Sequence, residues 1–209
     1  MKKYLALLLA LATVFALVAC GKMKTPATEP AATEPSATDP ATGKPVELPA
    51  TALALLESVW NAYGEDQKFL SMGGNYDEDE TKNNNVDNAP GKYALDNDGM
   101  TTVLMVPSEK LGDIAEAASL MHGMMANNFT SGAYKLKSGV DAKAFGEAMH
   151  SSIVSQRFLC GAPEAVLVVV IEDYVIATYG LKELLDVQSA KITSLYPNAQ
   201  VLHNELITE

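Results

Sequence analysis

Residues 165–179 read Ala-Val-Leu-Val-Val-Val-Ile-Glu-Asp-Tyr-Val-Ile-Ala-Thr-Tyr, and this stretch predicts the centre of the fold. The continuous apolar run from Ala165 to Ile171 is typical of a buried central strand. Glu172 and Asp173 separate it from a second β-rich run, Tyr174 to Tyr179, so the pair predicts a β-hairpin. Short hairpin connections usually contain Gly or Asn, which leaves the type of this turn open.

Further helices and strands are expected on both sides of this hairpin. Apolar spacing predicts helices along residues 53–63, 108–125, 141–153 and 181–195, and strands at 101–106, 129–137 and 200–207. Ser108 and Asp141 are suited to cap the second and third helices. The second helix is expected to turn these residues toward the core: Leu111, Ile114, Ala118, Met121 and Met125.

The predicted order α-β-α-β-α-β-β-α-β indicates an α/β fold of the α+β type. We expect a single domain over residues 51–209, with a mixed, mainly antiparallel sheet and helices packed on one face. Residues 71–99 are polar and rich in turn-forming residues, so they predict a long irregular loop.

Composition excludes several functional classes. The chain has 209 residues, of which 48% are hydrophobic, so a packed core is expected. It carries 15 basic and 26 acidic residues, a net charge of −11, and its one arginine is Arg157. This balance argues against nucleic-acid binding, which relies on basic surfaces. Two cysteines exclude a disulfide-stapled scaffold.

Residues 1–19 have the pattern of an export signal. Lys2 and Lys3 precede fifteen residues, Leu5 to Ala19, in which Thr13 is the one polar residue. A membrane-spanning helix needs roughly 20 apolar residues, so this segment is short for a permanent span. It fits the apolar region of a signal peptide. An uncleaved short membrane helix is the alternative.

The signal ends in Leu17-Val18-Ala19-Cys20-Gly21, which resembles the lipobox of bacterial lipoproteins. The resemblance implies transfer of diacylglyceryl to Cys20, cleavage before it, and acylation of the new amino terminus by chains such as palmitate. Two or three acyl chains anchor a protein stably, whereas one does not. The expected partner of Cys20 is therefore a lipid bilayer.

The resemblance also implies a location outside the cytoplasm. Cleavage removes two lysines and no acid, leaving 13 basic and 26 acidic residues, so the lipid rather than a basic face must hold the domain. Because residue 21 is Gly and not Asp, the common inner-membrane retention signal of diderm bacteria is missing. We expect anchoring to the bacterial plasma membrane of a monoderm host, with the outer membrane as the alternative.

Residues 20–50 predict a tether. Ala27-Thr28-Glu29-Pro30 is repeated twice more with a period of five, and six of the ten prolines lie between Pro26 and Pro49. Such a segment favours extended polyproline II at about 3.1 Å per residue, so thirty residues reach about 90 Å. It is either a spacer that lifts the domain or an inert linker. Residues 101–207 resemble an uncharacterised domain of monoderm lipoproteins. This resemblance implies a location outside the cytoplasm but no particular activity.

Three groups of residues invite a chemical interpretation. Cys160 lies ten residues after His150, but no cysteine-hydrolase motif surrounds it, so burial is the simpler explanation. The pairs Met121-His122 and Met149-His150, with Met124 and Met125, contain soft-metal ligands. Since the methionines occupy expected core positions, we predict core methionines with solvent-facing histidines and neither a metal site nor a cofactor.

The third group is acidic and lies in the loop 71–99. Its candidate ligand-binding residues are Asp77, Glu78, Asp79, Glu80, Asp96 and Asp98. Neither acidic run has the ligand spacing of an EF-hand, which leaves weak Ca²⁺ binding or a solvated loop. Glu78 and Asp96 also have the residue types of a paired-carboxylate hydrolase, but their separation cannot be read from the sequence.

The chain lacks the G-x-S-x-G, P-loop, H-E-x-x-H and C-x-x-C motifs. The leading hypothesis is therefore a non-catalytic binding or assembly module of the cell envelope, whose partner is an envelope protein or a cell-wall component. The loop 71–99 is its expected contact surface. The alternative is a cell-envelope hydrolase with a dispersed active site.

Overall fold

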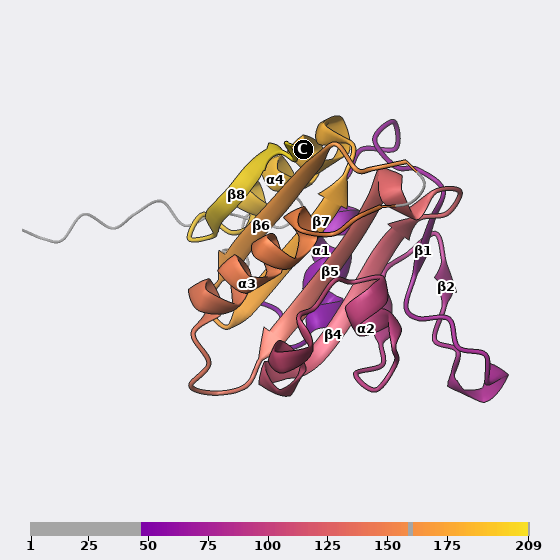
Figure 1. Cartoon of the computed structure of the whole chain (residues 1–209). Coiled ribbons are helices and arrows are strands. Elements are labelled where there is room, and N and C mark those ends of the chain that lie inside the picture. The colour runs from indigo at the N-terminus through magenta and orange to yellow at the C-terminus, as the bar shows by residue number, and fades with distance from the viewer. Residues whose placement is uncertain (1–46, 159–160, 209) are drawn as a thin grey trace, which may run out of the picture. The chain divides into compact units, whose positions relative to one another are not determined.

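The structure, a computed structural model, describes residues 47–158 and 161–208 (Figure 1). The strands in these ranges are β1 Ser71–Gly73, β2 Val86–Asp87, β3 Gly91–Tyr93, β4 Ile114–His122, β5 Phe129–Leu136, β6 Ala165–Ile171, β7 Tyr174–Gly180 and β8 Gln200–Leu206. The α-helices are α1 Ala52–Asn61, α2 Gly99–Thr102, α3 Ala142–Val154 and α4 Lys182–Leu195. Short 3₁₀ helices are η1 Glu80–Lys82, η2 Ser108–Asp113 and η3 Ala126–Asn128.

Within the described residues, the eight strands form one sheet in the order β2-β1-β4-β5-β7-β6-β8, and β3 also pairs with β4. Each of these pairings is antiparallel. The predicted α+β class with a mainly antiparallel sheet is therefore confirmed.

The predicted central hairpin is confirmed and forms β6 and β7. All residues of both strands are buried, and the register runs from Ala165 opposite Gly180 to Ile171 opposite Tyr174. The connection is Glu172-Asp173, and Glu172 adopts a left-handed backbone with φ of 52°. A residue other than glycine can take this conformation at a tight turn, although few do.

Successive residues of β6 enter two different cores, because side chains alternate between the faces of a strand. Val166, Val168 and Val170 pack in one core with Phe145 and Met149 of α3. The other core joins Leu167, Val169 and Ile171 to residues of α1 and α4. The expectation that the helices pack on one face was wrong, since α3 covers one face while α1 and α4 cover the other (Figure 1).

The predicted helix at 108–125 was also wrong. The segment forms η2 and then β4, which lies between β5 and the pair β1 and β3. Ala117, Ala118 and Ser119 are buried there, because both faces of β4 are covered. Small residues of this kind satisfy a helical spacing as easily as a strand, so tertiary packing decided the outcome. Met121 is half-buried, whereas Met125 lies beyond the strand and is exposed.

Residues 101–106 do not form the predicted strand. The segment contains the end of α2 and then a buried turn in which Met105 has φ of 58°. Two tyrosines replace the hydrogen bonds of a strand ladder. The Tyr179 hydroxyl donates to the Val103 carbonyl at 2.9 Å, and the Tyr134 hydroxyl donates to the Leu104 carbonyl at 3.2 Å. These bonds satisfy backbone groups that burial would otherwise leave unpaired.

The chain enters the described domain at one end of the sheet. The Tyr174 hydroxyl donates to the Pro49 carbonyl at 2.8 Å, and the Lys135 ammonium donates to the Ala50 carbonyl at 2.6 Å. Thr51 then caps α1 by accepting a hydrogen bond from the Ala54 amide. The predicted signal peptide, the lipidated Cys20 and most of the tether lie outside the described residues. No described helix is long and apolar enough to span a bilayer.

The expected irregular loop 71–99 contains β1, η1, β2 and β3, and glycines allow its strands to meet beside β4. A Cβ atom on Gly73 would lie 2.1 Å from the Gly91 amide nitrogen and 2.4 Å from the Ala89 carbonyl oxygen. Both are backbone atoms, so no side-chain rotation would relieve the contact.

We predict that Gly73→Ala lowers the free energy of unfolding by about 2 kcal/mol or more, because the added methyl group separates β1 from β3. Urea unfolding of the purified protein measures this change. Gly112→Ala is the matched control, since a Cβ there meets nothing within 4 Å. Equal unfolding midpoints for the two variants would contradict the close approach.

Candidate functional site

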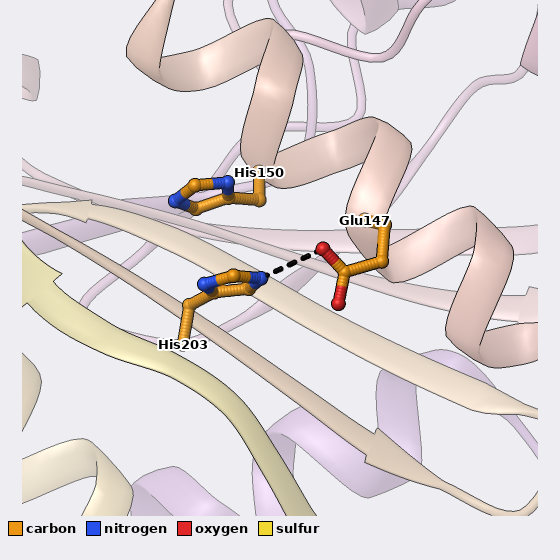
Figure 2. A group of neighbouring side chains, drawn as sticks. All are labelled: Glu147, His150 and His203. Carbon is orange, nitrogen blue, oxygen red and sulfur yellow. Dashed lines mark hydrogen bonds and ion pairs between the residues drawn. The ribbon is translucent and has the colours of Figure 1, made fainter.

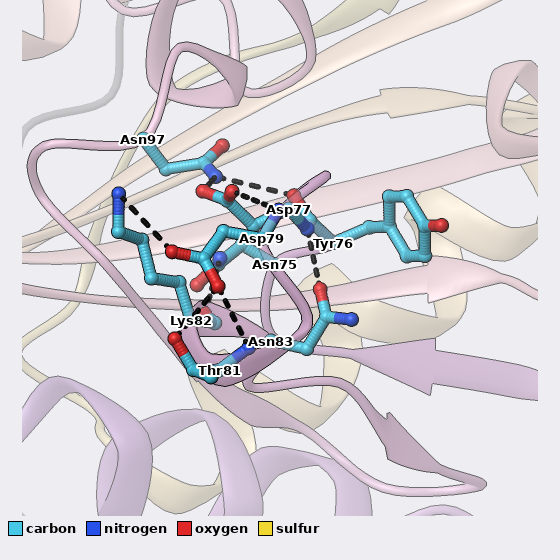
Figure 3. A network of polar contacts seen from close by, with 8 residues as sticks. All are labelled: Asn75, Tyr76, Asp77, Asp79, Thr81, Lys82, Asn83 and Asn97. Carbon is cyan, nitrogen blue, oxygen red and sulfur yellow. Dashed lines mark hydrogen bonds and ion pairs between the residues drawn. The ribbon is translucent and has the colours of Figure 1, made fainter.

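Two groups of polar side chains stand out in the described structure, at opposite edges of the sheet. One lies where α3 crosses β8 and contains Glu147, His150 and His203 (Figure 2). The other is a network of residues between β1 and α2 (Figure 3). The second group contains the acidic residues that the sequence pointed to, and it borders a hollow in the surface.

This hollow has a volume of about 680 Å³. Four carboxylates, those of Asp77, Glu78, Asp96 and Asp98, line it together with Lys82. We call it the acidic hollow. Tyr76 and Tyr93 also line it, with Met121 of β4 and Ala126 of η3 at its far side. Segments that are up to fifty residues apart in the chain therefore contribute to one surface.

Asn75 organises this region from a fully buried position. Its side-chain oxygen accepts hydrogen bonds from the Asn84 side chain and the Ala94 amide, both at 3.0 Å. Its amide nitrogen donates to the Lys82 carbonyl at 3.3 Å. One buried side chain thus joins three parts of the segment, and buried polar networks of this kind rigidify when their members are paired.

Asp77 and Asn97 connect the two walls of the acidic hollow (Figure 3). The Asn97 side-chain amide donates to the Tyr76 carbonyl and to the Asp77 carboxylate, each at 3.1 Å. The same carboxylate accepts from the Asp79 amide at 2.9 Å. Asn97 also accepts from the Gly99 amide at the start of α2. Asp77 is therefore half-buried and held in place by its neighbours.

The structure divides the six predicted acidic residues into two sets. Asp77, Glu78, Asp96 and Asp98 line the acidic hollow, and the last three are exposed. Asp79 and Glu80 are not among the lining residues. Asp79 instead caps η1, where hydrogen bonds from the side chain and then the backbone of Thr81 lower the pKa of its carboxyl group. Its role is structural.

Tyr93 supplies a neutral polar group to the acidic hollow. Burial raises the pKa of Tyr93 to about 12, and the nearby Tyr179 adds to the shift. The phenol therefore stays protonated at neutral pH and can donate a hydrogen bond. The hollow combines carboxylates, one ammonium group and aromatic walls, which suits a ligand with positive charge and some apolar surface.

The structure does not gather the methionine–histidine pairs into one site. Met149 is fully buried in the core, as predicted, but the prediction of core methionines was wrong for Met124 and Met125, which are exposed. His150, predicted to face solvent, is only 17% exposed. The His122 ring stacks on Phe69, with 5.3 Å between ring centroids, and its Nδ1 accepts from the Met124 amide at 3.2 Å. Cys160, the other predicted buried residue, lies outside the described residues.

The sequence predicted no site at the other edge of the sheet, where Glu147, His150 and His203 meet. Ligand atoms of Glu147, His150 and His203 all lie within 4.8 Å of one another, so these residues could hold a metal ion. The Glu147–His150 spacing on one helix was a readable signal, because residues three apart share a helix face. His203 comes from a strand more than fifty residues later, and its position could not be read.

No known protein family matches the chain, and no curated protein or solved structure is significantly similar to it. The interpretation of both groups therefore rests on their own chemistry.

We predict that Asn75→Ala destabilises the protein by about 2 kcal/mol, because a fully buried side chain is lost and the Ala94 amide and Lys82 carbonyl lose their partner. The segment 76–99 should also be cleaved faster by a protease of broad specificity. Asn85→Ala provides the comparison, since Asn85 is exposed. If both variants unfold at the same urea concentration, Asn75 does not organise the hollow.

Proposed function

We propose that the chain is a lipid-anchored, extracytoplasmic protein of the bacterial cell envelope that acts as a non-catalytic binding or assembly module. Its ligand-binding surface is the acidic hollow. The observation that carries this proposal is the convergence of four carboxylates around one open hollow whose walls are joined by hydrogen bonds. A preformed surface loses little conformational entropy when a ligand binds.

The anchor is supported by the sequence of residues 1–21. A positive start, an apolar run and a terminal Leu-Val-Ala-Cys resemble a lipobox, which makes Cys20 the acylated residue of the proposal. The proline-rich residues 20–50 then act as a spacer between lipid and domain.

The position of the acidic hollow agrees with such a tether. The chain enters the domain beside Lys135, at one end of β5. Met121 and Ala126 of the hollow lie near the opposite end, because Met121 pairs with Thr130. The five residue steps from Thr130 to Lys135 span about 17 Å along the strand. This part of the hollow is therefore separated along β5 from the point where the chain enters the described domain.

Charge indicates which ligand the acidic hollow binds. Four carboxylates face one lysine, so the hollow attracts cations and repels nucleic acids and anionic headgroups. The partner is then a basic segment of an envelope protein or an amine-bearing cell-wall component. Such binding weakens at high salt, since exposed charges are screened beyond about 8 Å at physiological ionic strength.

The alternative is a hydrolase that uses Glu78 and Asp96, which line the same hollow. Both carboxylates are exposed, whereas the general acid of a carboxylate pair works in a desolvated environment. The binding module is therefore the better supported function.

Cys20→Ala should abolish incorporation of labelled palmitate and leave a precursor that retains residues 1–19, because the thiol is the proposed acylation site. Metabolic labelling and mass spectrometry of the protein in its native host measure both effects. A wild-type chain with an unmodified Cys20 would disprove the anchor without bearing on the acidic hollow.

Neutralising the hollow should release its ligand. We expect Glu78→Gln with Asp96→Asn to reduce the yield of a crosslinked partner from native membranes several-fold. The matched control is Glu57→Gln with Asp66→Asn, which removes the same exposed charges on and just after α1. Equal yields would reject the hollow as the binding surface. Hydrolysis of a glycan or ester panel that only the hollow variant loses would favour the enzyme.

A further inference from the structure

The polar group where α3 crosses β8 has the composition of a metal site. Glu147 and His150 lie three residues apart on α3, so they share a helix face. His203 and Glu205 lie two residues apart on β8, so they share a face of that strand. Two imidazoles and two carboxylates thus meet between a helix and an edge strand (Figure 2 shows three of them).

A glycine brings the two elements this close. A Cβ atom on Gly146 would lie 2.8 Å from Cδ1 of Leu202 and 3.3 Å from Cγ1 of Val168. The absence of a side chain lets α3 approach β6 and β8 at the point where Glu147 faces His203. The group is therefore set by the packing of the core rather than by flexible surface side chains.

The donor atoms are already close to one another. His203 Nε2 lies 2.9 Å from a Glu147 oxygen, and His150 Nε2 lies 2.9 Å from a Glu205 oxygen. His203 Nδ1, the ring nitrogen that does not face Glu147, is 3.8 Å from the same Glu205 oxygen, so Glu205 lies beside both rings. Ligands bound to Zn²⁺ at about 2.1 Å in a tetrahedral site are about 3.4 Å apart. Among Glu147, His150 and His203 the present spread of up to 4.8 Å therefore closes by about 1.4 Å or less on binding, and Glu205 joins them through its contact with His150 Nε2.

The surroundings of the two carboxylates favour the binding of a metal ion. The two imidazole rings stack with 3.7 Å between centroids and an angle of 11°, and their side chains are 17% and 19% exposed. In the described residues, no lysine or arginine pairs with Glu147 or Glu205. Both carboxylates are therefore available to a divalent cation.

We propose that Glu147, His150, His203 and Glu205 bind one Zn²⁺ ion. Nitrogen donors select a borderline transition metal over Ca²⁺ and Mg²⁺, which prefer oxygen ligands alone. Four protein ligands make the closed coordination of a structural zinc site. The ion would clip β8 to α3, and β8 pairs within the sheet only with β6 among the described strands. This inference does not depend on the acidic hollow or on the anchor.

The test is titration calorimetry of the full chain, in detergent and without a polyhistidine tag, with Zn²⁺ alone. We expect one ion per chain and a rise in Tm with added zinc. His203→Ala and His150→Ala should each weaken binding by at least about 10-fold and remove the rise in Tm. Glu147→Gln, which keeps the size of an exposed side chain, should weaken binding without altering the zinc-free fold.

His122→Ala is the matched control, because His122 is the one histidine of the chain that is not part of the proposed site. It should bind zinc as the wild type does. The proposal is overturned if the wild type takes up no zinc, if His203→Ala and Glu147→Gln bind as tightly as His122→Ala, or if excess Ca²⁺ displaces the bound ion. The last outcome would indicate binding by carboxylates alone.

Discussion

Burial of the β6–β7 hairpin on both faces is the constraint on which the other elements depend. Every residue from Ala165 to Ile171 is buried, and each buried valine or isoleucine contributes about 1.5–3 kcal/mol relative to exposure. A strand of this composition needs a covering layer on each face. The helix α3 supplies one layer, and α1 with α4 supplies the other. The close passage of α3 over β6 then brings Glu147 and His150 to the edge strand β8.

The other half of the sheet is held by different means. Between β1 and α2 the chain is short of apolar residues, and hydrogen bonds from Asn75 and Asn97 replace a hydrophobic core. The absence of side chains at Gly73 and Gly91 lets β1 and β3 follow each other closely along one edge of β4. Because asparagine side chains make these hydrogen bonds, the carboxylates of Glu78, Asp96 and Asp98 remain exposed at the surface.

The two polar groups differ in the chemistry they offer. The acidic hollow presents oxygen donors and aromatic walls over a wide open surface, which suits an extended cationic partner. The group at β8 presents two imidazoles and the Glu147 carboxylate within 4.8 Å of one another, with Glu205 beside His150, which suits a single transition-metal ion. They lie at opposite edges of one sheet, so a ligand in the hollow and an ion at β8 would not compete for space.

Local sequence patterns were sufficient to predict an element wherever neighbours in the chain decide its structure. Apolar spacing and capping predicted the central hairpin, α1, α3 with its Asp141 cap, α4 and β8. The α+β class followed from their order. Three-dimensional packing was required where a segment suited two structures. Ile114–His122 fits a helix by spacing but is a strand, because β5 and β1 occupy both of its edges. The meeting of His150 with His203 likewise depends on which helix crosses which strand, and no local pattern encodes that crossing.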